Sequence, residues 1–513
     1  MAAAGTLSGV LLGVSMLPLG VGPVAFVALT PLLIALDTTR GERHAALAGY
    51  CCGLALFAIG FLWVPFVGDR RLSATLVYVA SVPLLALPLA AYGGLLAWFR
   101  RFGRIPMLVV AAPLWVAIES ARSAVELGSP WLHLGYALAD HPRLIQVASL
   151  GGVHLVSTWI VGVNASLAAA VFAGRSALLG FCVGIAWMAP LSCAAQTEAD
   201  AASARMQASL RVAAVQPHIA ARDRHVPERF DANLRVLLAL SERVLDTRPD
   251  LIVWPESAFE RSVAPSGFAF LDAIGHHLGA PLLTGVWRRA GPGAPWLYNS
   301  ALYVGLRTGS VRAADKRHPV PVYERAPGSA PARWLAAAGL WPGRFASGAA
   351  GEVLAVGRAG APSVGLGALV CIDASYPEIA RDLRRRGAEV LVTIANEADT
   401  GAWTAGLQAQ TARLRAVENR VPVVRVANTG PSEWIDARGR VLARLAAGGP
   451  GAATVSVPIG APASIYTQLG DGPLTALVLL LPCVVASAGK LRSRRTAGPA
   501  ARSGDPPPLE KES

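Results

Sequence analysis

The chain has 513 residues, of which 53% are hydrophobic and only 15% are charged, whereas soluble domains carry about 25% charged residues. This composition, with a mean hydropathy of +0.45, excludes a plain soluble enzyme and a disordered chain and indicates a membrane protein. The net charge of +13 does not require a nucleic-acid partner, because basic residues of membrane proteins gather in cytoplasmic loops. No basic run is interleaved with aromatic residues, so we expect no nucleic-acid surface.

Residues 1–195 are nearly continuous apolar sequence, interrupted by short basic or Pro/Gly segments. A helix needs about 20 apolar residues to cross a bilayer, so this region is expected to be a membrane domain of about seven helices. We expect no cleavable signal peptide, because no basic segment precedes the first helix. Gly5, Gly9 and Gly13, spaced by four residues, predict a helix-packing face. The helices are predicted near residues 5–19, 21–36, 44–67, 73–98, 104–121, 145–173 and 176–194.

Residues 205–462 differ in character, because charged residues return and short β-rich runs alternate with amphipathic helical stretches. Such alternation indicates an α/β domain, and about 255 residues suffice for a full hydrophobic core. Strands are predicted at Leu210–Gln216, Leu251–Trp254, Pro281–Trp287, Ser363–Cys371 and Val390–Ala395, and helices at Pro227–Asp246, Tyr376–Arg386 and Thr404–Arg420.

A last apolar run predicts a C-terminal transmembrane helix over residues 472–490. Residues 491–513 form a polar tail, which we expect to be cytoplasmic and disordered. The fold class is therefore a multi-span α-helical membrane bundle of about eight helices, plus an extramembrane α/β domain.

Basic clusters follow the second, fourth and eighth predicted spans. With eight spans they all lie on one side, which the positive-inside rule makes the cytoplasm. The α/β domain, after seven spans, then lies outside. Arg70 and Arg71 fall on the outer side and favour the opposite orientation. The clusters are Arg40 and Arg43; Arg100, Arg101 and Arg104; and Lys490, Arg492, Arg494, Arg495 and Arg502.

Several common catalytic motifs are absent: there is no G-x-S-x-G elbow, no Walker A loop and no H-E-x-x-H pair. The six cysteines have neither metal-ligand nor disulfide-framework spacing.

Three apolar runs of the α/β region end beside residues able to do chemistry: Glu256, Lys316 and Cys371. Cys371 stands between a strand and a helix, and helix N-termini stabilise thiolates, so its pKa is expected to be lowered. Taken singly, each residue has a structural explanation, as a cap or surface ion pair, a solvated lysine, or a core cysteine. Their joint occurrence in this order, about 50–60 residues apart, favours a catalytic group.

The segments around these residues resemble the Glu-Lys-Cys signatures of the nitrilase superfamily. They read Trp-Pro-Glu256-Ser, Asp-Lys316-Arg-His and Leu-Val-Cys371-Ile-Asp. With the surrounding spans and the Pro-Trp-Leu-His-Leu-Gly-Tyr segment at 130–136, they resemble the apolipoprotein N-acyltransferase family over residues 5–490. The resemblance implies a nitrilase-like α-β-β-α sandwich on the periplasmic side of a bacterial inner membrane.

The resemblance also implies a two-step acyl transfer. Cys371 attacks the ester of a phospholipid and becomes a thioester, and the α-amine of a diacylated apolipoprotein then takes the acyl chain. Glu256 acts as the base and Lys316 stabilises the oxyanion. Glu324 is an auxiliary carboxylate by family match. No metal or other cofactor is needed. Further substrate-binding candidates are Tyr298, Asn299, Ile372 and Asp373.

The sequence departs from the family pattern near the expected site. Ile372 and Asp373 replace an aromatic residue and a glutamate, Ala409 replaces a histidine, and Asp399 stands where the family has tryptophan. A tryptophan expected after Gln216 is missing, with Arg224 and His225 nearby. These changes imply reduced activity or an altered acceptor.

The sequence is also compatible with two other functions. One is a membrane-tethered nitrilase-like amidase that passes the acyl group to water, and the other is a non-catalytic or specialised paralogue that binds lipoproteins. The loop Arg325–Gly348 is either a lid that dips toward lipid or a loop that packs on its own domain. Its apolar residues are Trp334, Leu335, Leu340, Trp341 and Phe345.

Overall fold

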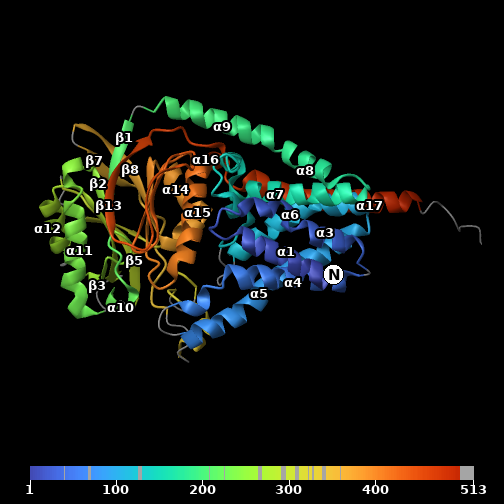
Figure 1. Ribbon diagram of the computed structural model, residues 1–513, viewed down its shortest axis with the longest axis horizontal. Coiled ribbons are helices and arrows are strands. Elements are labelled where there is room, and N and C mark those ends of the chain that lie inside the picture. Colours follow the sequence, from blue (N-terminus) through green and yellow to red (C-terminus); the bar gives the residue numbers. More distant parts are fainter. Residues whose placement is uncertain are drawn as a thin grey trace, which may run out of the picture.

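A bundle of apolar helices and an α/β sandwich lie end to end along the long axis of the molecule (Figure 1). The computed structural model describes residues 1–39, 41–67, 71–124, 130–206, 208–224, 226–263, 268–289, 296–306, 311–321, 323–325, 328–337, 343–358 and 360–496. Of the residues singled out above, Arg40, Arg70, His225, Leu340, Trp341 and Arg502 lie outside these ranges.

The bundle contains the apolar segments expected from the sequence. Within the described ranges, six helices are long and apolar enough to cross a membrane, and two shorter apolar helices, Ala2–Ser15 and Gly22–Asp37, accompany them. The seventh segment is a pair of helices that continues to Ala204, nine residues beyond the expected end of the membrane domain. The helices are α1 (Ala2–Ser15), α2 (Ala25–Ala28), α3 (Thr30–Asp37), α4 (Glu42–Gly60), α5 (Arg71–Arg100), α6 (Arg104–Ala124), α7 (Ala148–Phe172), α8 (Ala177–Ala186), α9 (Ala189–Ala204) and α17 (Gly472–Thr496).

Glycines let α1 pack closely on α4. A Cβ atom on Gly5 would lie 2.1 Å from the carbonyl oxygen of Ala48, and one on Gly9 would lie 2.1 Å from that of Cys52. Any larger residue would therefore push the two helices apart. The packing face predicted from the glycine spacing is confirmed.

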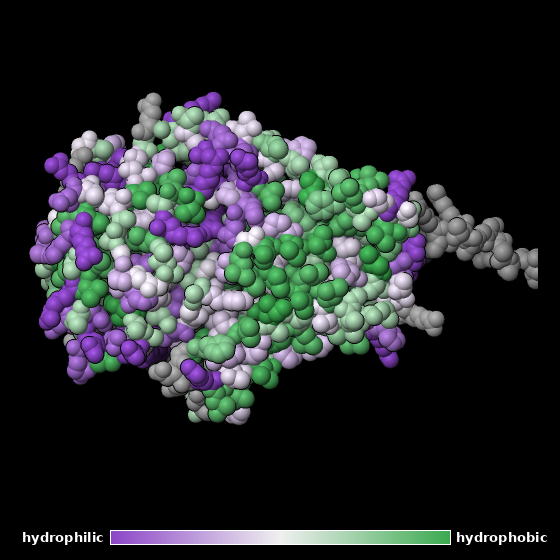
Figure 2. Space-filling model, in the orientation of Figure 1, coloured by the Kyte–Doolittle hydropathy of each residue, from purple (hydrophilic) through white to green (hydrophobic). Residues whose placement is uncertain are grey.

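The outer surface of the bundle is apolar, as a lipid-facing surface must be. Figure 2 shows a broad hydrophobic area over the helices, in contrast to the hydrophilic surface of the sandwich. Large side chains point outward from α5, where Leu84 is 62% exposed, and from α17, where Leu479 is 64% exposed. The protein is therefore a membrane protein.

Two β-sheets stack face to face in the sandwich. The first has the order β13-β1-β2-β4-β5-β6 with β3 beside β4, and the second has the order β12-β11-β10-β9-β8-β7. The strands are β1 (Ala208–Gln216), β2 (Leu251–Val253), β3 (Phe259–Val263), β4 (Leu282–Arg289), β5 (Leu297–Val304), β6 (Val311–Asp315), β7 (Leu354–Arg358), β8 (Ala361–Val370), β9 (Val390–Ala395), β10 (Val423–Ala427), β11 (Ser432–Ile435), β12 (Val441–Leu445) and β13 (Gly451–Ile459).

Helices cover both outer faces of the paired sheets. The first sheet packs on α11 (Phe230–Glu242) and α12 (Phe268–Leu278), and the second packs on α14 (Pro377–Arg385) and α15 (Gly401–Asn419). This is the expected α-β-β-α sandwich, and the sequence-predicted strands and helices coincide with observed elements. Shorter helices are α10 (Ala221–Arg224), α13 (Ala330–Ala337) and α16 (Ile465–Leu469).

The α14–α15 layer also joins the sandwich to the bundle (Figure 1). Its apolar residues share one buried cluster with bundle residues. The backbone N–H of Val153 on α7 donates to Glu418 Oε1 of α15 at 2.8 Å. The sandwich is thus fixed directly on the membrane helices.

Charged residues gather at the opposite end of the bundle. Asp37, at the end of α3, pairs with Arg100 at 2.6 Å and with Arg104 at 2.7 Å. The last turns of α17 reach the same place, because a Cβ on Gly489 would lie 2.3 Å from the ring of Phe102. Helix α17 continues to Thr496, beyond the expected boundary at 490.

Candidate active site

Glu256 follows the short buried strand β2 and is itself only 4% exposed. Asn299, on β5, donates from Nδ2 to Glu256 Oε1 at 2.7 Å. Asn396, just after β9, donates to the backbone oxygen of Glu256 at 3.2 Å. Asn299 therefore fixes the carboxylate of Glu256, and Asn396 fixes its backbone.

Lys316 follows β6, and its side chain has no exposed surface. Its Nζ lies 3.1 Å from Glu256 Oε1 and 2.9 Å from Glu324 Oε1. Burial disfavours the ammonium charge, but the carboxylates of Glu256 and Glu324 outweigh this effect and hold the pKa of Lys316 well above its usual value. Lys316 is thus a fixed positive charge.

Cys371 follows β8 and begins a short 3-10 turn, Cys371–Ser375. Its φ is +53°, a left-handed conformation that is rare for non-glycine residues and often marks functional sites. The Sγ atom accepts from Gln408 Nε2 of α15 at 3.4 Å. Gln408 was not predicted, because nothing in its local sequence links it to a strand end.

The pKa of Cys371 is raised well above the usual value, first by burial and then by the negative charge of Glu256, while Lys316 lowers it. The expectation of a lowered pKa was wrong. One turn of 3-10 helix offers little dipole, whereas enclosure removes the water that would stabilise a thiolate. The thiol is therefore neutral at rest and needs a base at the moment of reaction.

Residues 372 and 373 are buried and turn away from open space. Ile372 is 2% exposed and packs in the cluster shared with the bundle. Asp373 accepts backbone hydrogen bonds from Arg317 at 3.1 Å and His318 at 2.9 Å. Asp373 therefore holds the loop that follows Lys316.

Tyr298 and Asn299 are neighbours on β5, so their side chains point to opposite faces of the sheet. Asn299 faces Glu256, whereas the ring of Tyr298 lies 5.0 Å below the guanidinium of Arg288. The structure brings Asn299, but not Tyr298, to the glutamate.

The membrane domain supports the turn that contains Cys371. Trp131 donates from Nε1 to Ser375 Oγ at 3.0 Å, and Tyr136 donates from its hydroxyl to the Ser375 carbonyl at 3.0 Å. Both residues belong to the Pro-Trp-Leu-His-Leu-Gly-Tyr segment. This segment thus links the bundle to the backbone four residues beyond the candidate nucleophile.

A cleft of about 600 Å³ opens beside Glu256, and Arg224, Trp287, Arg344 and Asn396 also line it. Arg224 forms an ion pair with Asp399. Asp399, which departs from the family pattern, is therefore the partner of an arginine that lines the cleft. Ala409 is buried on α15, at 2% exposure.

The described parts of the loop Arg325–Gly348 differ in their surroundings. Phe345 is buried and its ring lies 5.4 Å from that of Trp287, so this end packs on the domain. Trp334, on α13, is 70% exposed.

Comparison with known proteins matches both halves of the chain. Residues 8–166 match the family described as apolipoprotein N-acyltransferase N-terminal domain, and residues 211–462 match the carbon-nitrogen hydrolase family. Three similar relatives are named apolipoprotein N-acyltransferase. That of Geobacter metallireducens is 29% identical and covers 91% of each chain, that of Azotobacter vinelandii is 30% identical and covers 85% of each, and that of Bradyrhizobium diazoefficiens is 31% identical and covers 92% of each.

Among solved structures, Saccharomyces cerevisiae Nit3, a member of the nitrilase superfamily, matches with a TM-score of 0.39 and 18% identity. The match covers 53% of this chain and 96% of that protein. An amidase from Nesterenkonia sp. matches with a TM-score of 0.34 and 18% identity, over 48% of this chain and 90% of the amidase.

Proposed function

The chain belongs to the apolipoprotein N-acyltransferase family, and from this premise we propose that it acylates the α-amine of the diacylglyceryl-cysteine of apolipoproteins, with a phospholipid as donor. The observation that supports this most is the contact between Lys316 and Glu256, whose charges both act on the Cys371 thiol. No comparison favours an amidase or a non-catalytic paralogue.

In the first step, Glu256 takes the thiol proton and Cys371 Sγ attacks the ester carbonyl carbon. Both hydrogen bonds that the described residues make to the Glu256 carboxylate go to Oε1, so Oε2 is the oxygen able to accept the proton. A C–S bond forms, the ester C–O bond breaks, and Glu256 returns the proton to the departing lysophospholipid oxygen. The product is a thioester on Cys371.

In the second step, the lipoprotein amine attacks the thioester carbonyl. A C–N bond forms, Glu256 removes a proton from the attacking nitrogen, and the C–S bond breaks to release the Cys371 thiolate, to which Glu256 returns the proton. The Lys316 ammonium stabilises the oxyanion in both steps, and the backbone N–H after Cys371 supplies a second donor. Donors that are already in place do not have to reorganise as this charge develops.

Enclosure of the nucleophile suits a thioester that must wait for an amine rather than react with water. Cys371 is 8% exposed, and the α14–α15 layer beside it packs on the membrane bundle. Low water content slows hydrolysis of reactive intermediates. This arrangement supports acyl transfer over release of the acyl group to water.

The sandwich is proposed to lie on the periplasmic side of the inner membrane. The last turns of α17 extend away from the sandwich (Figure 1), and Gly489 there lies against Phe102, between the ion-paired arginines Arg100 and Arg104. The positive-inside rule assigns that end to the cytoplasm. Arg71, at the start of α5, is the described residue with the opposite preference.

Complementation of a bacterial strain depleted of its own N-acyltransferase tests the proposal. Expression of this chain should restore growth, and mass spectrometry should find an amide-linked acyl chain on lipoprotein N-termini. Cys371→Ala should abolish both effects. The matched control is Cys193→Ala, at an exposed cysteine on α9, which should remain active. Restoration by Cys371→Ala would contradict the proposal.

A further inference from the structure

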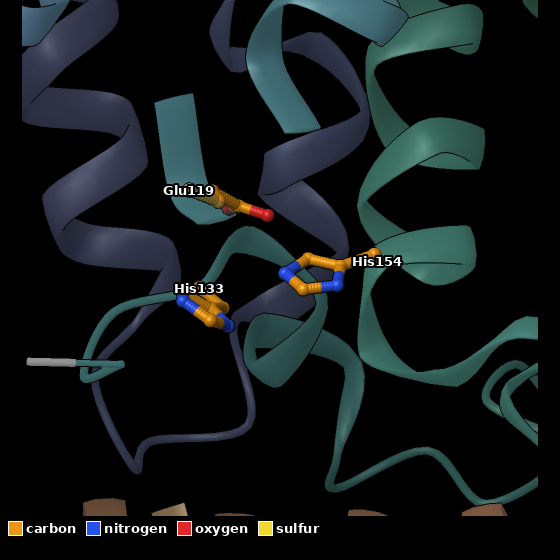
Figure 3. A group of neighbouring side chains, drawn as sticks. All are labelled: Glu119, His133 and His154. Carbon is orange, nitrogen blue, oxygen red and sulfur yellow. The ribbon is translucent and has the colours of Figure 1, made fainter. Parts of the chain in front are cut away.

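Two histidines and a glutamate meet inside the molecule, away from the candidate nucleophile. Glu119 comes from α6, His154 from α7, and His133 from the segment between them, and Figure 3 shows the three side chains grouped together. All three are buried, with exposures of 3%, 7% and 1% respectively. Each offers one metal-ligating atom, and these atoms lie within 4.8 Å of one another.

One polar atom of each side chain has no hydrogen-bond partner among the described residues. These atoms are Glu119 Oε2, His133 Nδ1 and His154 Nε2. No hydrogen bond joins the three described side chains to each other, although the imidazole rings of His133 and His154 are only 5.1 Å apart. An unpaired polar atom in a buried site is costly, and one shared ligand would satisfy all three.

The other polar atom of each side chain is held from outside the cluster. Glu119 Oε1 accepts from Trp115 Nε1 at 2.9 Å and from the backbone N–H of Leu134 at 2.6 Å. His133 Nε2 lies 2.9 Å from Ser123 Oγ, and His154 Nδ1 lies 3.2 Å from Asp471 Oδ1. Metal-binding histidines in proteins are typically oriented in this way, by a second group on the ring nitrogen that faces away from the metal.

We propose that Glu119, His133 and His154 bind one Zn²⁺ ion. Two imidazole nitrogens and one carboxylate oxygen are a ligand set that zinc uses, with a fourth position for water, and nitrogen ligands disfavour Mg²⁺ and Ca²⁺. An ion at the centre of the three atoms would lie within about 3 Å of each, so a small closing movement gives the usual bonds of about 2.0–2.2 Å.

The charges around the cluster are compatible with a bound cation. Two buried arginines, Arg122 and Arg415, lie near His133. Arg415 is neutralised by Glu418 at 3.0 Å. Glu119 and Asp471 supply negative charge on the ligand side.

The zinc ion joins α6, α7 and the segment between them. That segment includes Trp131 and Tyr136, which hold Ser375 beyond Cys371. The ion therefore fixes the segment that holds the candidate active-site turn. It takes no part in acyl transfer. Acyl transfer itself is still expected to need no metal or other cofactor.

Metal analysis of the full-length protein in detergent tests this site without reference to activity. Protein stripped with a chelator and dialysed against Zn²⁺ should retain about one ion per chain, and Co²⁺ in its place should give visible absorption characteristic of nitrogen and oxygen ligands. Failure of the wild-type protein to retain either ion would overturn the proposal, whatever the variants do.

Variants locate the ion. Glu119→Gln preserves an oxygen for the bonds from Trp115 and Leu134 but removes the carboxylate ligand, and it should lose the stoichiometric zinc. Asp471→Asn should weaken binding by about 10–100-fold, as loss of an outer partner usually does. His276→Gln, at an exposed histidine on α12, should bind as the wild type does. Full zinc retention by both Glu119→Gln and His133→Gln would place the ion elsewhere and contradict the proposal.

Discussion

Lys316 is fully buried between Glu256 and Glu324, and its positive charge balances these two carboxylates. In the proposed reaction the same charge stabilises the oxyanion. Lys316→Met removes the proposed oxyanion donor and leaves two buried carboxylates facing each other, one of which must take up a proton. We expect lysophospholipid release to fall by about 10²–10³-fold, as for loss of an oxyanion donor elsewhere. Lys490→Met, the same change near the far end of α17, should leave the rate unchanged. A rate for Lys316→Met close to that of the wild type would rule out this role.

Asp373 should make stability depend on pH. Burial raises its pKa from 3.8 to about 6, against the lowering effect of Lys316 and of backbone hydrogen bonds. The folded protein therefore binds this proton more tightly than the unfolded chain does. The resulting stabilisation, on the order of 3 kcal/mol, is complete below pH 3.8 and is lost as pH rises through about 6.

Thermal unfolding in detergent between pH 4 and 7 measures this effect of Asp373. Asp373→Asn should flatten the fall of Tm across that range, whereas Asp272→Asn, on the solvent side of α12, should leave it unchanged. Equal pH dependence in Asp373→Asn and the wild type would show that this carboxyl group does not titrate as described.

Residue identities at the site were more predictable than residue environments. Glu256, Lys316 and Cys371 stand at the ends of apolar runs, so their positions could be read from the sequence. The pKa direction of Cys371 could not, because it depends on enclosure by α15 and the bundle. Gln408 and the roles of Asp373 likewise depend on tertiary contacts.

Helices α1 and α4 pack too closely to admit a larger side chain at Gly9. Gly9→Val would place a Cβ 2.1 Å from the carbonyl oxygen of Cys52, so the helices must separate. We expect the free energy of unfolding to fall by about 1–3 kcal/mol, which is typical of overpacking. The Tm in detergent should fall as well. Gly41→Ala is the control, because a Cβ there meets nothing within 4 Å. Equal Tm values for Gly9→Val and the control would contradict this packing.

Among the strands, a continuous apolar run made prediction easier. Strand β9 is buried along its whole length and was predicted, whereas in β12 no residue is fully buried and its sequence gives no apolar run. The cluster of Glu119, His133 and His154 has no motif spacing, since it forms only when α6 and α7 pack together.

In the whole molecule, the proposed orientation puts the sandwich and the charged end of the bundle on opposite sides of the membrane. An alkaline phosphatase fusion near residue 300 should be active, because the enzyme matures only outside the cytoplasm, and a fusion after residue 496 should be inactive. The opposite pattern would reverse the orientation and remove lipoproteins as substrates.

Cys371 is proposed to carry the acyl chain between donor and acceptor, and trapping of the thioester is a direct test. Purified protein is incubated with phospholipid and no acceptor, then digested and examined by mass spectrometry. We expect an acyl group on the peptide that contains Cys371. When a diacylated cysteinyl peptide is added, this acyl group should leave Cys371 and be found as an amide on the added peptide. An acyl group on another residue, or amide formation by Cys371→Ala, would contradict it.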